Sequence, residues 1–131
     1  MYKRVITFIE KHSILYRHQY GFRKNRSKEM AIVNLTTKLI ESIERNEFTA
    51  GIFLDLSEAF DTVDHSITLS KLEHYGIRGI ALEWFKNYLT ERYQMVKFKN
   101  TISSKEKITC GVPQGSILGP LLFLIYVNDI Y

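Results

Sequence analysis

The chain has 131 residues, of which 45% are hydrophobic and 24% are charged, and its formal net charge is +4 at pH 7. This length can bury a sizeable core in one domain, and the hydrophobic fraction excludes an intrinsically disordered chain. A single cysteine excludes an internal disulfide and a cysteine-rich zinc site, whereas the positive charge permits a polyanionic partner.

Apolar residues at helical spacing predict two helices in the first third of the chain. The first covers Tyr2–Lys11, and the second covers Lys28–Arg45 with Ser27 as its N-cap. We expect the apolar face of the second helix, which includes Ile32 and Leu39, to pack against the rest of the protein.

The loop between these helices is rich in basic residues. Arg23, Lys24 and Arg26 lie close to Tyr20 and Phe22 in the sequence. Such a loop can hold phosphate groups and stack on a base, but a charge-rich loop is often only a solvated turn. The residues alone leave both interpretations open.

A short apolar run from Thr49 to Leu54 ends in a carboxylate at Asp55. The run predicts a buried strand, and Asp55 at its tip would meet a metal ion or a substrate from a rigid position. Phe60 follows closely enough to cover the same site. The alternative is that Asp55 begins a turn or caps the next helix, as aspartate often does.

Two further helices are predicted, from about Ser66 to Tyr75 and from Gly79 to Leu89. Gly76 is expected to close the first, and Trp84 is expected to anchor the second in the core. Three residues just before the first helix could in principle hold a metal, but we favour capping and turn roles for them: Asp61, Asp64 and His65.

A β-hairpin is predicted by two β-like runs, Tyr93–Phe98 and Lys105–Cys110. A loop rich in glycine and proline follows, with Pro113, Gln114 and Gly115 at its centre. Its glycines would let a backbone or a nucleotide approach closely, although the loop could also be a plain connection to the closing helix, which should begin near Pro120.

Four segments together resemble, in order and spacing, the reverse transcriptases of non-LTR (LINE-type) retrotransposons. They are Gln19–Arg23, Phe53–His65, Lys71–Ile77 and Gly111–Phe123. The resemblance implies an α+β fold that forms part of a right-hand polymerase. It implies a single partial reverse transcriptase domain, with residues 1–48 on the fingers side and residues 49–131 in the palm.

The resemblance also implies the roles of individual residues. Asp55 would bind both catalytic Mg²⁺ ions, the carbonyl of Leu56 would help to hold one of them, and Phe60 would exclude a ribonucleotide by clashing with its 2′-hydroxyl. The incoming nucleotide and the template base would lie beside the loop of Pro113, Gln114 and Gly115. On the fingers side, the template or substrate would be contacted by Arg23, Lys24 and Arg26. The partners implied for the full-length enzyme are an RNA template, a DNA primer and dNTPs.

One departure from the family pattern matters for activity. The third palm motif, an aromatic residue followed by Ala-Asp-Asp, does not occur in the 131 residues. Because one carboxylate cannot hold two Mg²⁺ ions, we expect that this chain alone does not polymerise. The alternatives are a non-catalytic nucleic-acid-binding remnant and a pseudogene product. No signal peptide or bilayer-spanning run is recognisable, so an intracellular, non-secreted protein without a membrane partner is expected.

Overall fold

The computed structural model describes residues 1–130. In that part of the chain the helices are α1 (Tyr2–Lys11), α2 (Lys28–Glu44), α3 (His65–His74), α4 (Ile80–Leu89) and α5 (Gly119–Val127). The strands are β1 (Tyr93–Gln94), β2 (Lys97–Phe98), β3 (Thr101–Ile102) and β4 (Glu106–Lys107). Helices and small antiparallel sheets therefore coexist, which agrees with the predicted α+β class.

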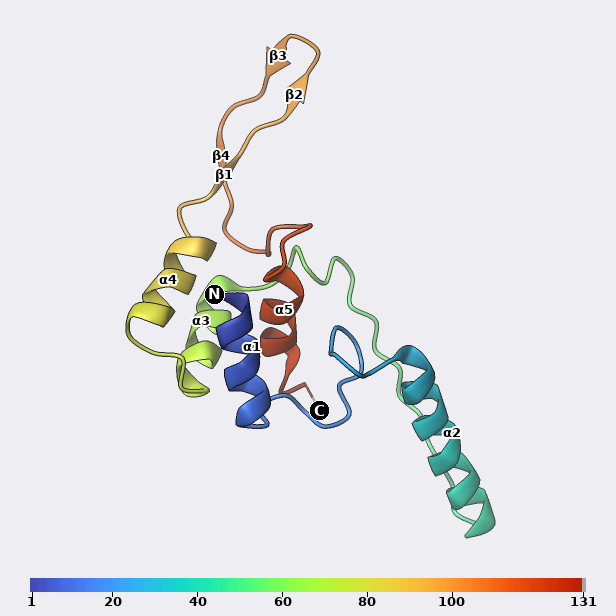
Figure 1. Cartoon of the computed structure of the whole chain (residues 1–131). Coiled ribbons are helices and arrows are strands. Elements are labelled where there is room, and N and C mark those ends of the chain that lie inside the picture. The colour runs from blue at the N-terminus through green and yellow to red at the C-terminus, as the bar shows by residue number, and fades with distance from the viewer. Residues whose placement is uncertain (131) are drawn as a thin grey trace.

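Helices α1, α3, α4 and α5 form the body of the molecule, while α2 and the β-hairpin extend from it in different directions (Figure 1). The core lies between these four helices, and each of them contributes one or more of its deeply buried apolar side chains, which include Ile9, Leu72, Phe85, Leu89 and Leu122. The body is thus held together mainly by the burial of aliphatic and aromatic surface.

Helix α3 is capped at both ends by the residues predicted to do so. The Asp64 carboxylate accepts a hydrogen bond from the backbone N–H of Ile67 at 2.9 Å, which makes it the N-cap. At the other end, Gly76 has a φ of +93° and Ile77 donates its N–H to the carbonyl of Leu72 at 2.9 Å. This is the hydrogen-bond pattern of a Schellman motif, so glycine closes the helix as expected.

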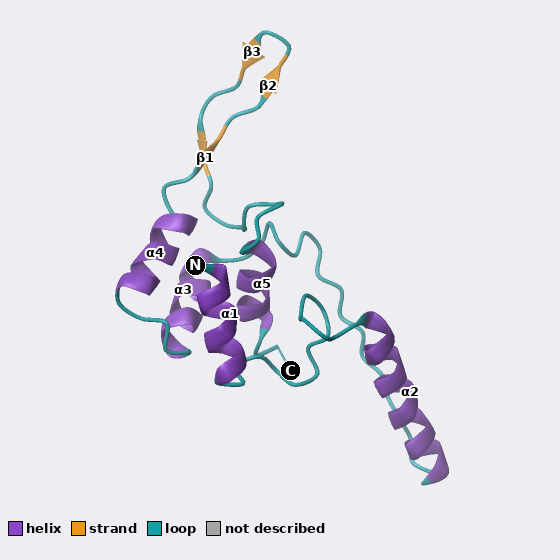
Figure 2. Ribbon diagram, in the orientation of Figure 1, coloured by secondary structure: helices purple, strands orange, loops and turns teal. Residues whose placement is uncertain are grey.

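The predicted hairpin is present, but its strands are short and exposed (Figure 2). Tyr93 pairs with Lys107 in the lower ladder, and Lys97 pairs with Ile102 in the upper one. The register changes by one residue between the two ladders, which places a bulge in the returning arm. The hairpin therefore stands in solvent as a twisted arm rather than as part of a packed sheet.

Three expectations about packing are wrong for the residues that the structure describes. The run from Thr49 to Leu54 is not a buried strand, because it has no regular structure and Ile52 and Phe53 are 87% and 86% exposed. The apolar face of α2 is also exposed, and Trp84 keeps 38% of its surface in solvent. A strand needs a neighbour to pair with, and an amphipathic face needs a surface to cover it. The described residues supply neither.

None of the helices in residues 1–130 combines the length and the apolar character that crossing a bilayer requires.

Candidate functional site

Backbone hydrogen bonds join two segments that lie far apart in the sequence, residues 60–63 and residues 111–112. Gly111 donates its N–H to the carbonyl of Val63 at 2.8 Å, and Val112 donates to the carbonyl of Phe60 at 2.9 Å. Gly111 has a φ of +84°, and a Cβ atom built on it would lie 2.8 Å from the carbonyl oxygen of Asp61. Only glycine therefore allows both the backbone conformation and the close approach.

Side chains reinforce the same junction. Gln114 donates its Nε2 amide to both carboxylate oxygens of Asp61, at 3.0 and 2.9 Å. The ring Nε2 of the buried His65 lies 2.7 Å from the carbonyl oxygen of Gly111. Because the amide NH₂ is bound to Asp61, the carbonyl oxygen of Gln114 is the part of the amide left to accept a hydrogen bond from a ligand. Spacing in the sequence gave no sign of the contact between Asp61 and Gln114.

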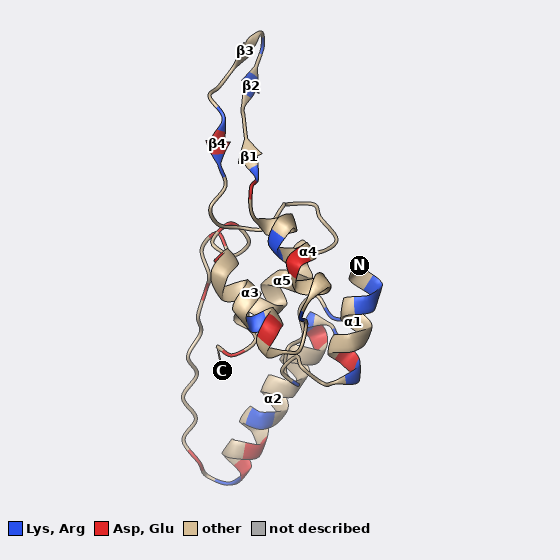
Figure 3. Cartoon of the chain, turned by 90° about the vertical axis from the view of Figure 1, so that its left-hand side faces the viewer, with Lys and Arg blue, Asp and Glu red and all other residues tan. Residues whose placement is uncertain are grey.

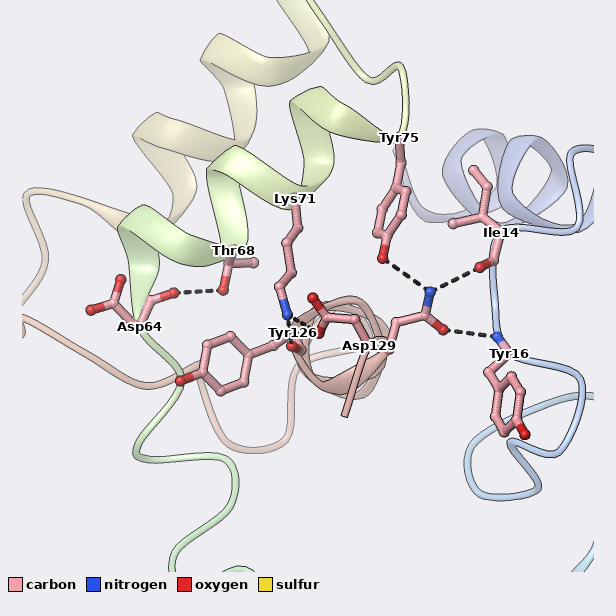
Figure 4. A network of polar contacts seen from close by, with 9 residues as sticks. Ile14, Tyr16, Asp64, Thr68, Lys71, Tyr75, Tyr126 and Asp129 are labelled. Carbon is pink, nitrogen blue, oxygen red and sulfur yellow. Dashed lines mark hydrogen bonds and ion pairs between the residues drawn. The ribbon is translucent and has the colours of Figure 1, made fainter. Parts of the chain in front are cut away.

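Asp55 and Leu56 line a cleft of about 570 Å³ together with residues of α3 and α5. The Asp55 side chain is exposed, and within residues 1–130 it takes part in no hydrogen bond or ion pair. In the same cleft, Lys71 donates to the carbonyl of Tyr126 and forms an ion pair with Asp129 (Figure 4). The hydrogen bond from Lys71 lowers the pKa of Asp129. The cleft thus holds one free carboxylate and one that is already neutralised.

Asp55 and Leu56 carry oxygen atoms of a kind that could hold a metal ion. Mg²⁺ prefers hard oxygen ligands, which the carboxylate of Asp55 and the carbonyl of Leu56 can provide. Within residues 1–130, however, no cluster of three or more His, Cys, Asp or Glu side chains could hold a metal ion. Asp61 is a hydrogen-bond partner of Gln114, and Asp64 is a helix cap. Both observations agree with the structural roles favoured for these residues.

A second cleft, of about 720 Å³, is lined by Pro113 and Gln114 on one side and by the base of the hairpin on the other. Asp61 lines this second cleft. Other residues of the segment 55–62 line the first cleft, together with residues of α3 and α5. Four of the predicted site residues are therefore divided between two clefts, with Asp55 and Leu56 in the first and Pro113 and Gln114 in the second. Gly115 follows Gln114 in the loop with a φ of +76°.

Phe60 lies in an aromatic cluster. Its ring centroid is 5.6 Å from that of Phe22 in an edge-on arrangement and 4.9 Å from that of Phe123 on α5. Phe60 is half-buried and is not among the described residues that line either cleft. These contacts bring the basic loop against the segment that carries Asp55.

The three basic residues of that loop have different surroundings. The Nη1 group of Arg23 donates to the carbonyl of Tyr16 at 3.0 Å, whereas Lys24 is exposed. The guanidinium carbon of Arg26 lies 5.5 Å from the ring centroid of Tyr20. Partial burial, together with nearby positive charges that include Arg26, lowers the pKa of His18. The loop therefore gathers positive charge, and further Lys and Arg residues lie along both arms of the hairpin (Figure 3).

Sequence reasoning missed a second structural junction, at Asn128. Its side chain accepts a hydrogen bond from the N–H of Tyr16 at 2.8 Å and donates to the carbonyl of Ile14 at 2.8 Å and to the hydroxyl of Tyr75 at 3.0 Å. These partners are drawn in Figure 4. A lone asparagine at the end of an apolar run carries no signal of such contacts, because they depend on distant segments.

Comparisons with known proteins identify the family of this chain. A profile of the family described as reverse transcriptase (RNA-dependent DNA polymerase) matches residues 1–131. The chain is 34% identical over 123 residues to a probable RNA-directed DNA polymerase from transposon BS of Drosophila melanogaster, which covers 89% of this chain and 13% of that protein. It is 32% identical over 126 residues to the corresponding proteins from transposon X-element and from mobile element jockey of the same organism, covering 96% of this chain and 14% of each relative.

The chain thus spans only 13–14% of the length of these three relatives. The match nevertheless extends over all the motifs that carry the candidate site. This chain belongs to the reverse transcriptase (RNA-dependent DNA polymerase) family, among the polymerases of non-LTR retrotransposons.

Proposed function

We propose that the chain contributes one part of the nucleotidyl-transfer centre of an RNA-directed DNA polymerase. The observation that carries this proposal is the junction that holds Gln114 against Asp61, because it places the Pro-Gln-Gly loop beside the segment that bears Asp55. In this proposal, residues 1–48 belong to the fingers side and residues 49–131 to the palm of a right-hand polymerase.

Asp55 and Leu56 would supply oxygen ligands to Mg²⁺ from the cleft beside α3 and α5. The chemistry that Mg²⁺ would supply in such a centre is activation of the primer hydroxyl and stabilisation of the leaving pyrophosphate. The chain's own contribution is positioning, which accounts for much of the catalysis of phosphoryl transfer. Asp61 fixes the amide of Gln114, and the paired Lys71 keeps Asp129 from competing for the metal.

Phe60 would select the sugar. The contacts with Phe22 and Phe123 hold its ring on two sides, so it would not yield easily to an additional hydroxyl group. A dNTP would fit beside it, whereas the 2′-hydroxyl of an rNTP would clash. The carbonyl oxygen of Gln114 would accept a hydrogen bond from the bound nucleotide or template base.

A nucleotide titration tests this arrangement. We expect Mg·dATP to shift the NMR signals of the Gln114 side-chain NH₂ more than Mg·ATP does at the same concentration, and Phe60→Val to reduce that difference. Equal shifts from the two nucleotides in the unsubstituted chain would contradict the sugar-selecting role. Asp55→Asn should weaken the response to both nucleotides, because it removes the negative charge of a side chain that would hold Mg²⁺.

The activity of the isolated chain requires a separate experiment. The 131 residues lack the Ala-Asp-Asp motif, and the described part holds too few carboxylates for two ions, so we propose that they do not extend a primer alone. Primer extension on an RNA template with Mg²⁺ and dNTPs measures this directly. Robust extension that Asp55→Asn abolishes would overturn the proposed inactivity.

A second candidate function is nucleic-acid binding without catalysis, favoured by the positive charge around Arg26 and its contact with Tyr20. It predicts binding of an RNA–DNA hybrid that weakens steeply with salt and does not change in Asp55→Ala. Binding that requires Asp55 and Mg²⁺ would favour the first function instead.

A further inference from the structure

A buried imidazole contacts the beginning of the Pro-Gln-Gly loop. His65 is the first residue of α3 and keeps only 8% of its surface in solvent. Its ring Nε2 lies 2.7 Å from the carbonyl oxygen of Gly111, just before the loop. A polar ring buried to this extent needs a hydrogen-bond partner. In the described part of the protein, the contact with Gly111 is the only hydrogen bond of this side chain.

The chemistry of the contact fixes which ring nitrogen carries the proton. A carbonyl oxygen accepts hydrogen bonds and cannot donate one, so Nε2 of His65 must be the donor. In the neutral ring the proton is then on Nε2, and Nδ1 is unprotonated. Among the described residues, no other group donates to the carbonyl of Gly111. Without the imidazole, this part-buried carbonyl would lose its partner.

The loop is tied to the segment around the start of α3 by a part-buried contact and by an exposed one. His65 makes the first with Gly111, and Asp61 makes the second with Gln114. Asp61 and Gln114 are both exposed, so water competes for the hydrogen bonds between them. Water replaces the donor of a part-buried carbonyl less readily. Of the two contacts, the one made by His65 is therefore the stronger anchor.

The backbone between the two contacts has little freedom. Val112 is buried and donates its N–H to the carbonyl of Phe60 at 2.9 Å. The ring of Pro113 fixes its own φ. A displacement of Gly111 would therefore be passed on to Gln114, which lines the cleft of about 720 Å³.

We propose that His65 is a positioning residue, whose Nε2–H holds the carbonyl of Gly111 and thereby sets the place of Gln114 in this cleft. Asp61 then sets the orientation of the Gln114 amide. The proposal rests on the proposed function only in taking the nucleotide as the ligand whose affinity depends on Gln114. The hydrogen bond from His65 and its effect on Gln114 do not depend on that function.

Two amide variants that differ in reach test the positioning. In His65→Gln, the amide nitrogen is as many bonds from Cα as the Nε2 of histidine, so it can still donate to Gly111. In His65→Asn, the side chain is shorter by a methylene group and cannot reach. We expect the NMR signals of the Gln114 side-chain NH₂ to keep their positions in His65→Gln and to shift in His65→Asn. Equal signals in the two variants would overturn the proposal.

Titration with Mg·dATP, followed on the same NH₂ signals, measures the effect on binding. His65→Asn should weaken the affinity by about three- to tenfold, as expected for the loss of one hydrogen bond, whereas His65→Gln should stay within about twofold of the unsubstituted chain. Unchanged affinity in His65→Asn would contradict the positioning role. If the unsubstituted chain does not respond to Mg·dATP, the proposed function fails, and the NH₂ signals without nucleotide still decide whether His65 positions Gln114.

A measurement on the unsubstituted chain does not depend on the folding of any variant. At about pH 8, where an unperturbed imidazole is neutral, the Nε2–H proton of His65 should give an observable NMR signal, because its hydrogen bond slows exchange with water. The exposed rings of His12 and His74 should give none. Absence of the His65 signal, or a signal from Nδ1–H in its place, would overturn the proposal.

Discussion

Gly111→Ala should disrupt the junction between residues 60–63 and 111–112. Alanine in the left-handed conformation costs about 1–2 kcal/mol, of which roughly 0.4–1 kcal/mol is offset by the lower entropy of the unfolded chain. The new Cβ would also lie 2.8 Å from the carbonyl oxygen of Asp61, which is backbone and cannot rotate away. The loop must then shift and weaken the two backbone hydrogen bonds, each contributing about 1 kcal/mol.

The expected loss of unfolding free energy is therefore about 2–4 kcal/mol for Gly111→Ala. Gly115→Ala is the matched control, because Gly115 has a φ of +76° but nothing within 4 Å of an added Cβ. It should cost only about 1 kcal/mol, the strain of the backbone alone.

Urea unfolding followed by circular dichroism measures both values, and the NMR signals of the Gln114 NH₂ report whether its bond to Asp61 survives. Gly111→Ala should shift those signals, whereas Gly115→Ala should shift them less. Equal costs for the two substitutions, with the Gln114 signals unchanged in both, would refute the close approach of the two segments.

Three further predictions concern other parts of the fold. Asn128→Ala should cost about 2–3 kcal/mol, because it removes part-buried hydrogen bonds to the carbonyl of Ile14 and to the hydroxyl of Tyr75, which lie on two other segments, and a change in thermal unfolding smaller than that of an exposed-site variant would contradict this role. Asp64→Ala should cost about 1 kcal/mol at pH 7. Because hydrogen bonds from Ser66 and the helix N-terminus lower the pKa of Asp64, this stabilisation is complete above the unfolded pKa of about 4 and is lost as the pH falls through the lower folded value. Urea titrations at pH 7 and pH 3 should show a smaller difference from the unsubstituted chain at the lower pH, and an equal difference at both would exclude the ionised cap. Finally, Leu122→Ala should cost about 2–5 kcal/mol, whereas Ile32→Ser on the exposed face of α2 should cost less than about 0.5 kcal/mol, and equal costs would show that this face is packed.

Features that depend on local chemistry could be predicted from the sequence. Ser27 and Asp64 begin helices because their side chains accept hydrogen bonds from N–H groups of the first turn, and Gly76 ends one because it tolerates a positive φ. The loop around Gln114 follows from its glycines and prolines in the same way. These signals act within a few residues and need no knowledge of the rest of the chain.

Features that depend on distant partners could not be predicted in the same way. The run that ends at Asp55 has the composition of a strand, but composition does not supply the neighbour that a strand must pair with. The spacing of Ile32 and its equivalents predicts a helix correctly but says nothing about what covers its apolar face. The contact between Asp61 and Gln114 cannot be read from the sequence for the same reason.

The proposed metal-binding role of Asp55 can be tested most directly with Mn²⁺, a paramagnetic ion with ligand preferences close to those of Mg²⁺. In ¹H–¹⁵N NMR spectra of the 131-residue chain, low concentrations of Mn²⁺ should broaden the amide signals of Asp55 and Leu56 before those of other residues. Asp55→Asn should abolish this selective broadening, whereas Asp129→Asn, which removes the partner of Lys71 in the same cleft, should preserve it. Selective broadening that persists in Asp55→Asn would contradict the account.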